Sequence, residues 1–173
     1  MPAPIIRFAR GDESALVIDI DDDATRLYAT AGLELDLSPS NPFGIAERAR
    51  WTLAVREGRV LLALDDRGVP AGFAALGIVD GAAYIDQLSV RLEAMRRGLG
   101  GGLVRAALDW ASASGGGLWL NTYGHLPWNR PFYERLGFRL VPEPEWGPEM
   151  RAIVEGQRAA IPLPEQRIVM HHA

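Results

Sequence analysis

The chain contains no cysteine among its 173 residues, which excludes disulfide bonds, thiolate metal ligands and a cysteine nucleophile. It also has no run of about 20 apolar residues, the length needed to span a bilayer. Its N-terminus lacks an apolar stretch behind a basic start, so no secretory signal is expected. These absences favour a soluble, cytoplasmic protein without a membrane partner.

The chain has no surplus of basic residues either. Its 18 basic and 22 acidic side chains give a formal net charge of −4 at pH 7. Proteins that bind nucleic acid usually carry a basic surplus, so we expect no nucleic-acid partner. The histidines, at positions 125, 171 and 172, lack the spacing of a zinc site, and no metal is expected. The acidic run 19–23 lacks the glycine and final glutamate of a calcium loop, and we interpret it as a solvated helix face.

What is present indicates a globular protein. Apolar residues make up 48% of the chain and charged residues 23%, and the length suits one domain with a full core, so we expect residues 1–173 to form a single domain. Turn signals at 65–68 and 80–81 link three strands into an antiparallel meander, and the fold class is mixed α/β (α+β). The predicted elements are strands at 5–9, 59–64, 69–79, 82–90, 118–122, 138–141 and 166–171, and helices at 15–31, 43–57, 98–114, 129–136 and 149–160.

Two finer expectations concern the first half of the chain. Hydrophobic spacing predicts that Ile45, Ala49 and Leu53 of the second helix face inward, with Trp51 as a further candidate. In the second strand of the meander, Gly72 and Gly77 are candidate β-bulges, because a glycine inside a strand often marks one.

The most informative local feature is a glycine-rich turn at Arg96–Gly102, read as RRGLGGG, between a strand and a helix. Each glycine costs a helix start about 1 kcal/mol relative to alanine, so close approach of another group to the backbone is a reason to keep them. Backbone N–H groups and the helix dipole at such a start favour an anion. A plain strand-to-helix turn is the alternative. A dinucleotide fingerprint fits poorly and a P-loop fails, because Leu103 breaks the first spacing and no Gly-Lys-Ser/Thr follows.

Two segments carry a resemblance to a known family. The segment Tyr84–Gly101, beginning YIDQLSV and ending RRGLGG, resembles the coenzyme-binding motif of the GNAT superfamily of N-acetyltransferases, and NTYGHLPWNRPFYERLGF at 121–138 resembles the second conserved motif of that superfamily. The second wording is similar to a group of small bacterial members. The resemblance covers about 59–173, and residues 1–58 match it only in outline. Met95 departs from the motif, which usually has Gln or Arg there.

This resemblance implies a GNAT fold, with a central, mostly antiparallel, twisted sheet that splays at the coenzyme site and is flanked by helices. It implies acetyl-coenzyme A as co-substrate. The exposed backbone of the strand ending at Val90 would pair with the pantetheine arm, and backbone N–H groups of the turn would hold the pyrophosphate together with the two arginines. The residues so assigned to the coenzyme are Leu88, Ser89, Val90, Arg96, Arg97, Gly98, Leu99, Gly100, Gly101 and Asn129.

The same resemblance suggests catalytic groups. Tyr133 occupies the position at which the family commonly places a tyrosine that protonates the leaving thiolate, and the alternative is a core residue of its helix. Asp86 is the candidate base for the attacking amine, and the alternatives are a hydrogen bond to a neighbouring strand or binding of the substrate cation.

Acceptor contacts are expected from Glu34 and Asp36 in the loop between the first helices, from Tyr84, which shares a strand face with Asp86, and from Trp128. The implied function is transfer of an acetyl group to a primary amine of a small molecule or peptide by direct attack. A non-catalytic acyl-coenzyme A-binding regulatory module and a longer acyl donor are the alternatives. A homodimer through the C-terminal strand is a family-level expectation.

Overall fold

A computed structural model describes residues 3–173. The strands of this part of the chain form one seven-stranded sheet in the order β1-β2-β3-β4-β5-β7-β6. All neighbours are antiparallel except β4 and β5, which are parallel. The prediction of a mixed α/β fold with a mostly antiparallel sheet is confirmed. The strands are β1 (Ile5–Phe8), β2 (Val60–Leu64), β3 (Pro70–Val79), β4 (Ala82–Val90), β5 (Leu118–Tyr123), β6 (Arg139–Val141) and β7 (Arg167–His172).

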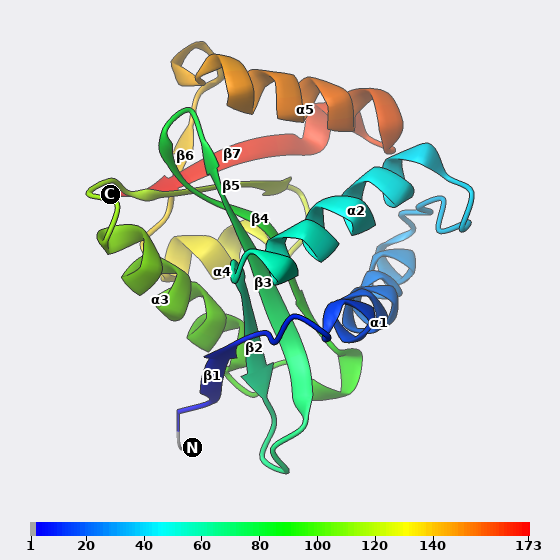
Figure 1. The fold of residues 1–173 in the computed structure, drawn as a ribbon. Coiled ribbons are helices and arrows are strands. Elements are labelled where there is room, and N and C mark those ends of the chain that lie inside the picture. The colour runs from blue at the N-terminus through cyan, green and yellow to red at the C-terminus, as the bar shows by residue number, and fades with distance from the viewer. Residues whose placement is uncertain (1–2) are drawn as a thin grey trace.

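Helices cover both faces of this sheet (Figure 1). The α-helices are α1 (Ser14–Thr25), α2 (Pro42–Arg56), α3 (Leu99–Ser112), α4 (Arg130–Arg135) and α5 (Pro148–Ala160). On one face lie α3 and α4, and on the other lie α1, α2 and α5. Among the helices of residues 3–173, none combines the length and apolar character that crossing a membrane requires.

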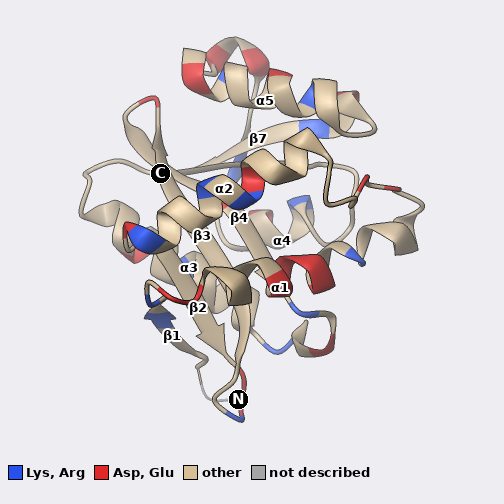
Figure 2. Cartoon of the chain, turned by 45° about the vertical axis from the view of Figure 1, so that its right-hand side comes forward, with Lys and Arg blue, Asp and Glu red and all other residues tan. Residues whose placement is uncertain are grey.

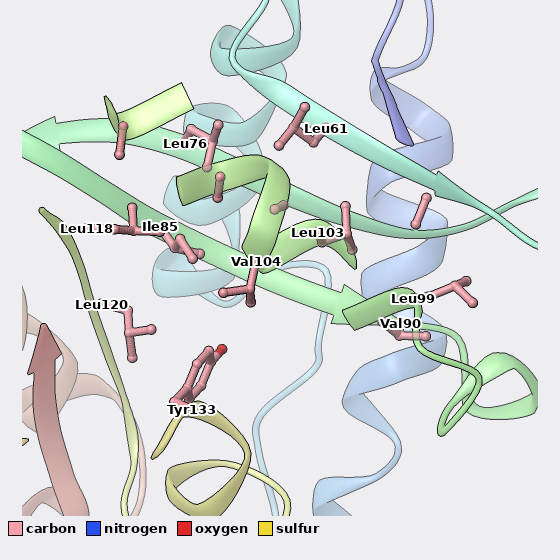
Figure 3. Close-up of a cluster of buried hydrophobic side chains, with 14 of the residues drawn as sticks. Leu61, Leu76, Ile85, Val90, Leu99, Leu103, Val104, Leu118, Leu120 and Tyr133 are labelled. Atoms are coloured by element: carbon pink, nitrogen blue, oxygen red, sulfur yellow. The ribbon is translucent and has the colours of Figure 1, made fainter. Parts of the chain in front are cut away.

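The largest core cluster lies between the sheet and the helices α3 and α4. Figure 3 shows how leucines of several strands meet the side chains of α3 there, with Tyr133 of α4 at the edge of the group. Burying such side chains contributes roughly 1.5–3 kcal/mol each, so this layer holds the strands against α3. Its labelled members include Leu61, Leu76, Ile85, Val90, Leu99, Leu103, Val104, Leu118 and Leu120.

The residues of α2 that face the core are not all those expected from the sequence. Ile45 and Leu53 are about half exposed, at 52% and 51%, and Ala49 is also exposed, so the prediction that these three face inward is wrong. Trp51 is buried as predicted, and its ring lies 5.8 Å from that of Phe73 on β3. Apolar residues occur on two faces of this helix, and packing of the large indole against the sheet selects one of them.

β3 has two irregularities. Against β2, Gly72 pairs with Ala63 and Pro70 with Leu64, so the extra residue is Ala71 and a bulge lies beside Gly72 as predicted. Gly77 marks none, because the register of β3 against β4 shifts between Ala75 and Leu76. Gly72 also serves packing. A Cβ at that position would lie 3.1 Å from the carbonyl oxygen of Ser89, so glycine allows close packing of β3 against β4.

The turn between β3 and β4 also caps α5, which leads to a stability prediction. The carboxylate of Asp80 accepts hydrogen bonds from the N–H groups of Glu149 and Met150, both at 2.9 Å. We expect Asp80→Ala to lower the free energy of unfolding by about 1–2 kcal/mol, the usual cost of losing an N-terminal cap. Denaturant unfolding measures this. Asp12→Ala, at a carboxylate that is 84% exposed, serves as control and should change stability by less than about 0.5 kcal/mol. Equal effects of the two variants would contradict the capping role.

Candidate functional site

The sheet opens next to the bulge between β3 and β4. β4 and β5 pair only from Ala83 to Ile85 on β4, and beyond this point β4 continues to Val90 without a partner on that side among the described residues. The bulge is at Asp86, because Ala75 pairs with Gln87 and the next residue of β3 pairs with Ile85. The extra residue switches which side chains of β4 face α3. The predicted splay of the sheet is therefore confirmed, and a bulge re-aims side chains at its start.

The glycine-rich turn leads from β4 into α3. Arg96 and Gly98 both have positive φ, at 61° and 83°, and Gly98 is the N-terminal flanking residue of α3. Within residues 3–173, the backbone N–H groups from Arg96 through Gly101 donate to no acceptor, whereas that of Gly102 donates to the carbonyl of Gly98. Six consecutive donors at the start of a 14-residue helix form a strong anion-binding feature.

The glycines of this turn are kept for different reasons. Gly98 supplies the left-handed backbone. Gly102 is required by packing, because a Cβ there would lie 2.5 Å from a side-chain carbon of Pro4. Gly100 faces Phe132, which a Cβ would meet at 3.4 Å. The expectation that these glycines serve close approach of a ligand therefore needs correction for Gly102.

The two arginines of the turn diverge. Arg96 lines the opening beside β4. The side chain of Arg97 instead lies 3.9 Å from the carboxylate of Asp66 in the β2–β3 turn and does not line this opening, although its N–H belongs to the row of free donors. A further arginine that sequence reasoning missed, Arg135 at the end of α4, lines the same opening. Its place within the ERLGF segment was the available signal.

An opening of about 560 Å³, here called the outer cleft, connects these features. It runs between the unpaired part of β4, the turn and α4. Of the predicted coenzyme residues, Leu99 does not line the outer cleft, since its side chain is buried in the core. The predicted residues that line the outer cleft are Leu88, Ser89, Val90, Arg96, Gly98, Gly100, Gly101, Trp128, Asn129 and Tyr133.

Three of these residues behave differently from the expectation. The hydroxyl of Ser89 donates to the carboxylate of Asp21 at 2.7 Å and is thereby occupied. Asn129 precedes α4 as predicted, but its side chain makes no cap and donates to the carbonyl of Tyr123 at 3.3 Å. Trp128, expected at the acceptor site, lines the outer cleft instead.

A second opening, here called the inner pocket, lies behind the outer cleft and has a volume of about 160 Å³. The two openings are adjacent, because they share a wall. The shared residues are Thr25, Tyr28, Gln87, Leu88, Asn129 and Tyr133. The inner pocket is also lined by charged side chains from α1, α2, β4 and β7, namely Asp21, Glu47, Asp86 and Arg167.

Tyr133 is placed at the junction of the two openings. Its ring packs against Phe132 and Phe138, with centroids 5.0 and 5.6 Å away, so it is also a core residue. Figure 3 shows the side chain projecting from α4 toward Val104 and β4. Desolvation, with a smaller effect of Tyr28, raises the pKa of the Tyr133 phenol above its ordinary value. Like an ordinary tyrosine, the phenol is protonated at neutral pH, and desolvation disfavours its ionised form further.

Asp86 and Tyr84 line a common groove between α2 and α5, as expected from their shared strand face. The carboxylate of Asp86 accepts two hydrogen bonds from Arg50 of α2, at 3.2 and 3.3 Å, while it lines the inner pocket. Tyr84 is buried, and its hydroxyl accepts a hydrogen bond from Asn121. Tyr84 does not line the inner pocket itself, whereas Asp86 and Asn121 do.

Sequence reasoning missed Glu47, which extends from α2 into the inner pocket. Its side chain is 24% exposed. Desolvation, together with the nearby carboxylates of Asp21 and Asp86, raises the pKa of Glu47 to about 7, against a smaller opposite effect of Arg50. The signal for this placement was helical spacing, since Glu47 precedes buried Trp51 by one turn.

The acidic run of α1 is only partly the solvated face that we expected. Asp19 and Asp22 are on the surface, where they pair with Arg91 and Arg48. Figure 2 shows this acidic segment beside α2, which carries both signs of charge. The prediction is wrong for Asp21, which lines the inner pocket and accepts hydrogen bonds from side chains of β4 and α1. Burial raises the pKa of Asp21 despite these bonds.

The loop before α2 contributes less than expected. Asp36 lines the inner pocket, where its carboxylate accepts the N–H of Ser38 at 2.9 Å. Glu34 is exposed and lines neither opening, so its predicted contact with an acceptor is not supported. Among residues 3–173, no group of three or more His, Asp or Glu side chains converges as a metal-ligand set.

Comparison with known families identifies the class of protein. The model of the acetyltransferase (GNAT) family matches residues 19–138, which is more than half of the chain. The chain therefore belongs to the GNAT family of acetyltransferases, and the resemblance noted in the sequence is confirmed.

Solved structures agree in fold. The PaiA N-acetyltransferase of Thermoplasma acidophilum, solved with coenzyme A, is similar with a TM-score of 0.68 at 14% identity, over 99% of both chains. A GNAT acetyltransferase of Staphylococcus aureus Mu50 has a TM-score of 0.71 at 12% identity, over 98% of both chains. N-acetylglutamate synthase of Neisseria gonorrhoeae, solved with coenzyme A and N-acetyl-glutamate, has a TM-score of 0.65 at 20% identity. The match covers 99% of this chain but 35% of the Neisseria chain, so this chain spans about a third of that enzyme.

Proposed function

We propose that the protein transfers an acetyl group from acetyl-coenzyme A to a primary amine of a small molecule or peptide. The observation that carries the proposal is the row of six free N–H donors from Arg96 to Gly101, which opens onto the outer cleft. Structures of similar fold were solved with coenzyme A, and one of them also holds the small molecule N-acetyl-glutamate. A cytoplasmic location and a homodimer remain predictions.

The residues of the outer cleft fit the coenzyme. The free N–H groups suit a pyrophosphate, and Arg96 and Arg135 add positive charge at the mouth. The unpaired backbone of β4 between Asp86 and Val90 offers hydrogen-bonding groups to the amide-containing arm. Because Met95 packs against the core, no side chain at that position binds the phosphates, and backbone donors carry this role.

When bound, acetyl-coenzyme A supplies a thioester whose carbon–sulfur bond breaks as the amine nitrogen bonds to the acyl carbon, releasing acetylated amine and free thiol. Tyr133 holds a proton at its phenol oxygen where the outer cleft meets the inner pocket, and donates it or a hydrogen bond to the leaving sulfur. A carboxylate of the inner pocket accepts the proton that the amine loses.

Two carboxylates compete for the role of base. Asp86 was the sequence candidate, but Arg50 binds it through two hydrogen bonds. Glu47 lies 4.0 Å from Arg50 and has a pKa of about 7, close to the value that favours proton transfer at neutral pH. We therefore assign the base to Glu47, acting directly or through water, with Asp86 positioning Arg50.

Coenzyme binding tests the first part of the proposal. A coenzyme A concentration one hundred times its Kd should stabilise the protein by about 2.7 kcal/mol, measured by thermal unfolding. Gly98→Ala places a Cβ at a φ of 83° and should weaken binding about tenfold, the equivalent of one charge-assisted hydrogen bond. Gly116→Ala, in an exposed loop with open space around it, is the matched control and should not change binding.

Release of free thiol with a panel of amines tests the second part. A protein that binds acetyl-coenzyme A but releases no thiol with any amine would be the acyl-coenzyme A-binding module instead. Comparison of acetyl-, propionyl- and succinyl-coenzyme A ranks the donors, and faster turnover with a longer donor would contradict acetyl transfer.

A further inference from the structure

Arg167, at the start of β7, points its charge toward the inner pocket without a carboxylate partner. Its guanidinium donates to the side-chain oxygen of Asn121 and lies 4.8 Å from the ring centre of Tyr123. Its Nε–H is buried and has no hydrogen-bond partner among residues 3–173. Desolvation lowers the pKa of Arg167, and the nearby tyrosines and Glu47 offset this only in part.

This situation sets Arg167 apart from the other basic residues. The chain has no lysine, so all 18 basic residues are arginines. Most of those in the described range lie within 4.0 Å of a carboxylate. The arginines without one are Arg56, Arg96, Arg105, Arg135, Arg139 and Arg167, and all of them except Arg167 are exposed to solvent, which screens their charge.

The inner pocket therefore carries charges of both signs. Arg167 lies at the β5–β7 side, while Glu47 and Asp21 approach from α2 and α1. Glu47 and Arg167 are not within 4.0 Å of each other, so they do not neutralise one another as an ion pair. A ligand that carries both a positive and a negative group matches this arrangement. The volume of about 160 Å³ is below the roughly 300–1,000 Å³ of sites for drug-sized ligands, which favours a small molecule over a peptide.

We propose that the acceptor is an amine that also carries a carboxylate, of the amino-acid class, and that Arg167 binds this carboxylate. The guanidinium then holds the acceptor with its amine on the side of Glu47 and Tyr133. Bidentate pairing of arginine with a carboxylate gives both charge compensation and orientation. The proposal rests on the proposed function, since it names the class of acceptor for that site.

The ligand comparison uses amino acids, the corresponding amino-acid amides and the decarboxylated amines, which keep the amine and lose the negative charge. Thiol release is measured for several side chains and compared at equal concentrations of unprotonated amine. The wild-type protein should use acids with a kcat/KM at least about tenfold above that of the amides. Equal use of acids and amides would overturn the proposal while leaving amine acetylation intact.

The variants locate the effect. Arg167→Met should lower kcat/KM for acids by roughly 10- to 150-fold and leave amides within about twofold, the range for a hydrogen bond to a charged group. Arg167→Lys keeps the positive charge but loses the bidentate geometry of the guanidinium, so its kcat/KM for acids should lie between those of the wild-type protein and Arg167→Met. Arg139→Met, at an exposed arginine of β6, is the control and should leave kcat/KM unchanged for both acids and amides. An equal loss for acids and amides in Arg167→Met would assign Arg167 a purely structural role and refute the proposal.

A binding experiment at equilibrium tests this proposal separately from the proposed function. With coenzyme A saturating, N-acetyl-amino acids should raise the melting temperature of the wild-type protein more than N-acetyl-amino-acid amides. This comparison needs no turnover and no variant, so it decides the point even if no amine is acetylated or Arg167→Met fails to fold. Equal shifts with the two ligands would contradict binding of the carboxylate.

Discussion

Tyr133→Phe should lower kcat by about 100-fold or more, the lower end of what a positioned acid contributes, with little change in KM for either substrate. The phenol lies where the two openings meet and is protonated at neutral pH, so its loss removes the proton donor to the leaving sulfur. The ring contacts with Phe132 and Phe138 persist in the variant, so its melting temperature should stay close to that of the parent. Steady-state kinetics and thermal unfolding measure the two effects.

Tyr28 provides the matched comparison for this prediction. It lines both openings as well, and desolvation also raises its pKa. If Tyr28→Phe loses more activity than Tyr133→Phe, the acid is Tyr28. If Tyr133→Phe turns over at the parent rate, the ring is only a packing residue of the core.

Glu47→Gln should lower kcat/KM by about 100-fold or more and remove the pH dependence near neutrality. In the parent, activity should rise with pH through about 7, because the carboxylate is the form that accepts a proton and is populated above this pKa. The charged groups that set this pKa are Asp21 of α1, Asp86 of β4, Arg50 of α2 and Arg167 of β7. A pH profile of kcat/KM for both proteins tests the prediction. The base would instead be Asp86 if Glu47→Gln kept the pH profile of the parent and Asp86→Asn lost the rise of kcat/KM near pH 7.

Glu47→Gln should lose activity but gain stability against unfolding at pH 8. The folded pKa of Glu47, about 7, is above the ordinary value of 4.5, so the folded state loses stability as pH rises between these two values. Glu47→Gln removes this loss and should raise the free energy of unfolding at pH 8 by up to about 3 kcal/mol, with no gain at pH 4. Glu155→Gln, at an exposed position of α5, is the control. Denaturant unfolding at both pH values measures the difference, and an equal gain at pH 4 and pH 8 would contradict the raised pKa.

The part of the site that is local in sequence could be predicted, and the dispersed part could not. The turn at Arg96–Gly102 and the helix with Tyr133 each lie within one short segment, whose residues and spacing are visible directly. The inner pocket draws charged residues from four elements and a loop, and no local pattern relates positions 21, 47, 86 and 167.

Weak signals for these missed residues do exist. Asp21 follows buried Val17 by four residues, and Glu47 precedes buried Trp51 by four, so both lie on inward helix faces. Arg167 is two residues before buried Val169 and shares its side of β7. Charge on an inward face was the available indication of a site, and we interpreted the acidic run of α1 as solvated instead.

By itself, the sequence determined the order of the elements, the antiparallel meander, the family and the glycine turn, because periodicity, turn residues and motif spacing depend on neighbours along the chain. Only the tertiary structure decided which face of α2 is buried, that a bulge lies at Asp86, that Arg97 turns toward Asp66, and that Arg167 lines the inner pocket with its Nε–H buried and unpartnered among residues 3–173. These outcomes depend on packing and desolvation between distant segments, and both arise only when the sheet and its helices are assembled.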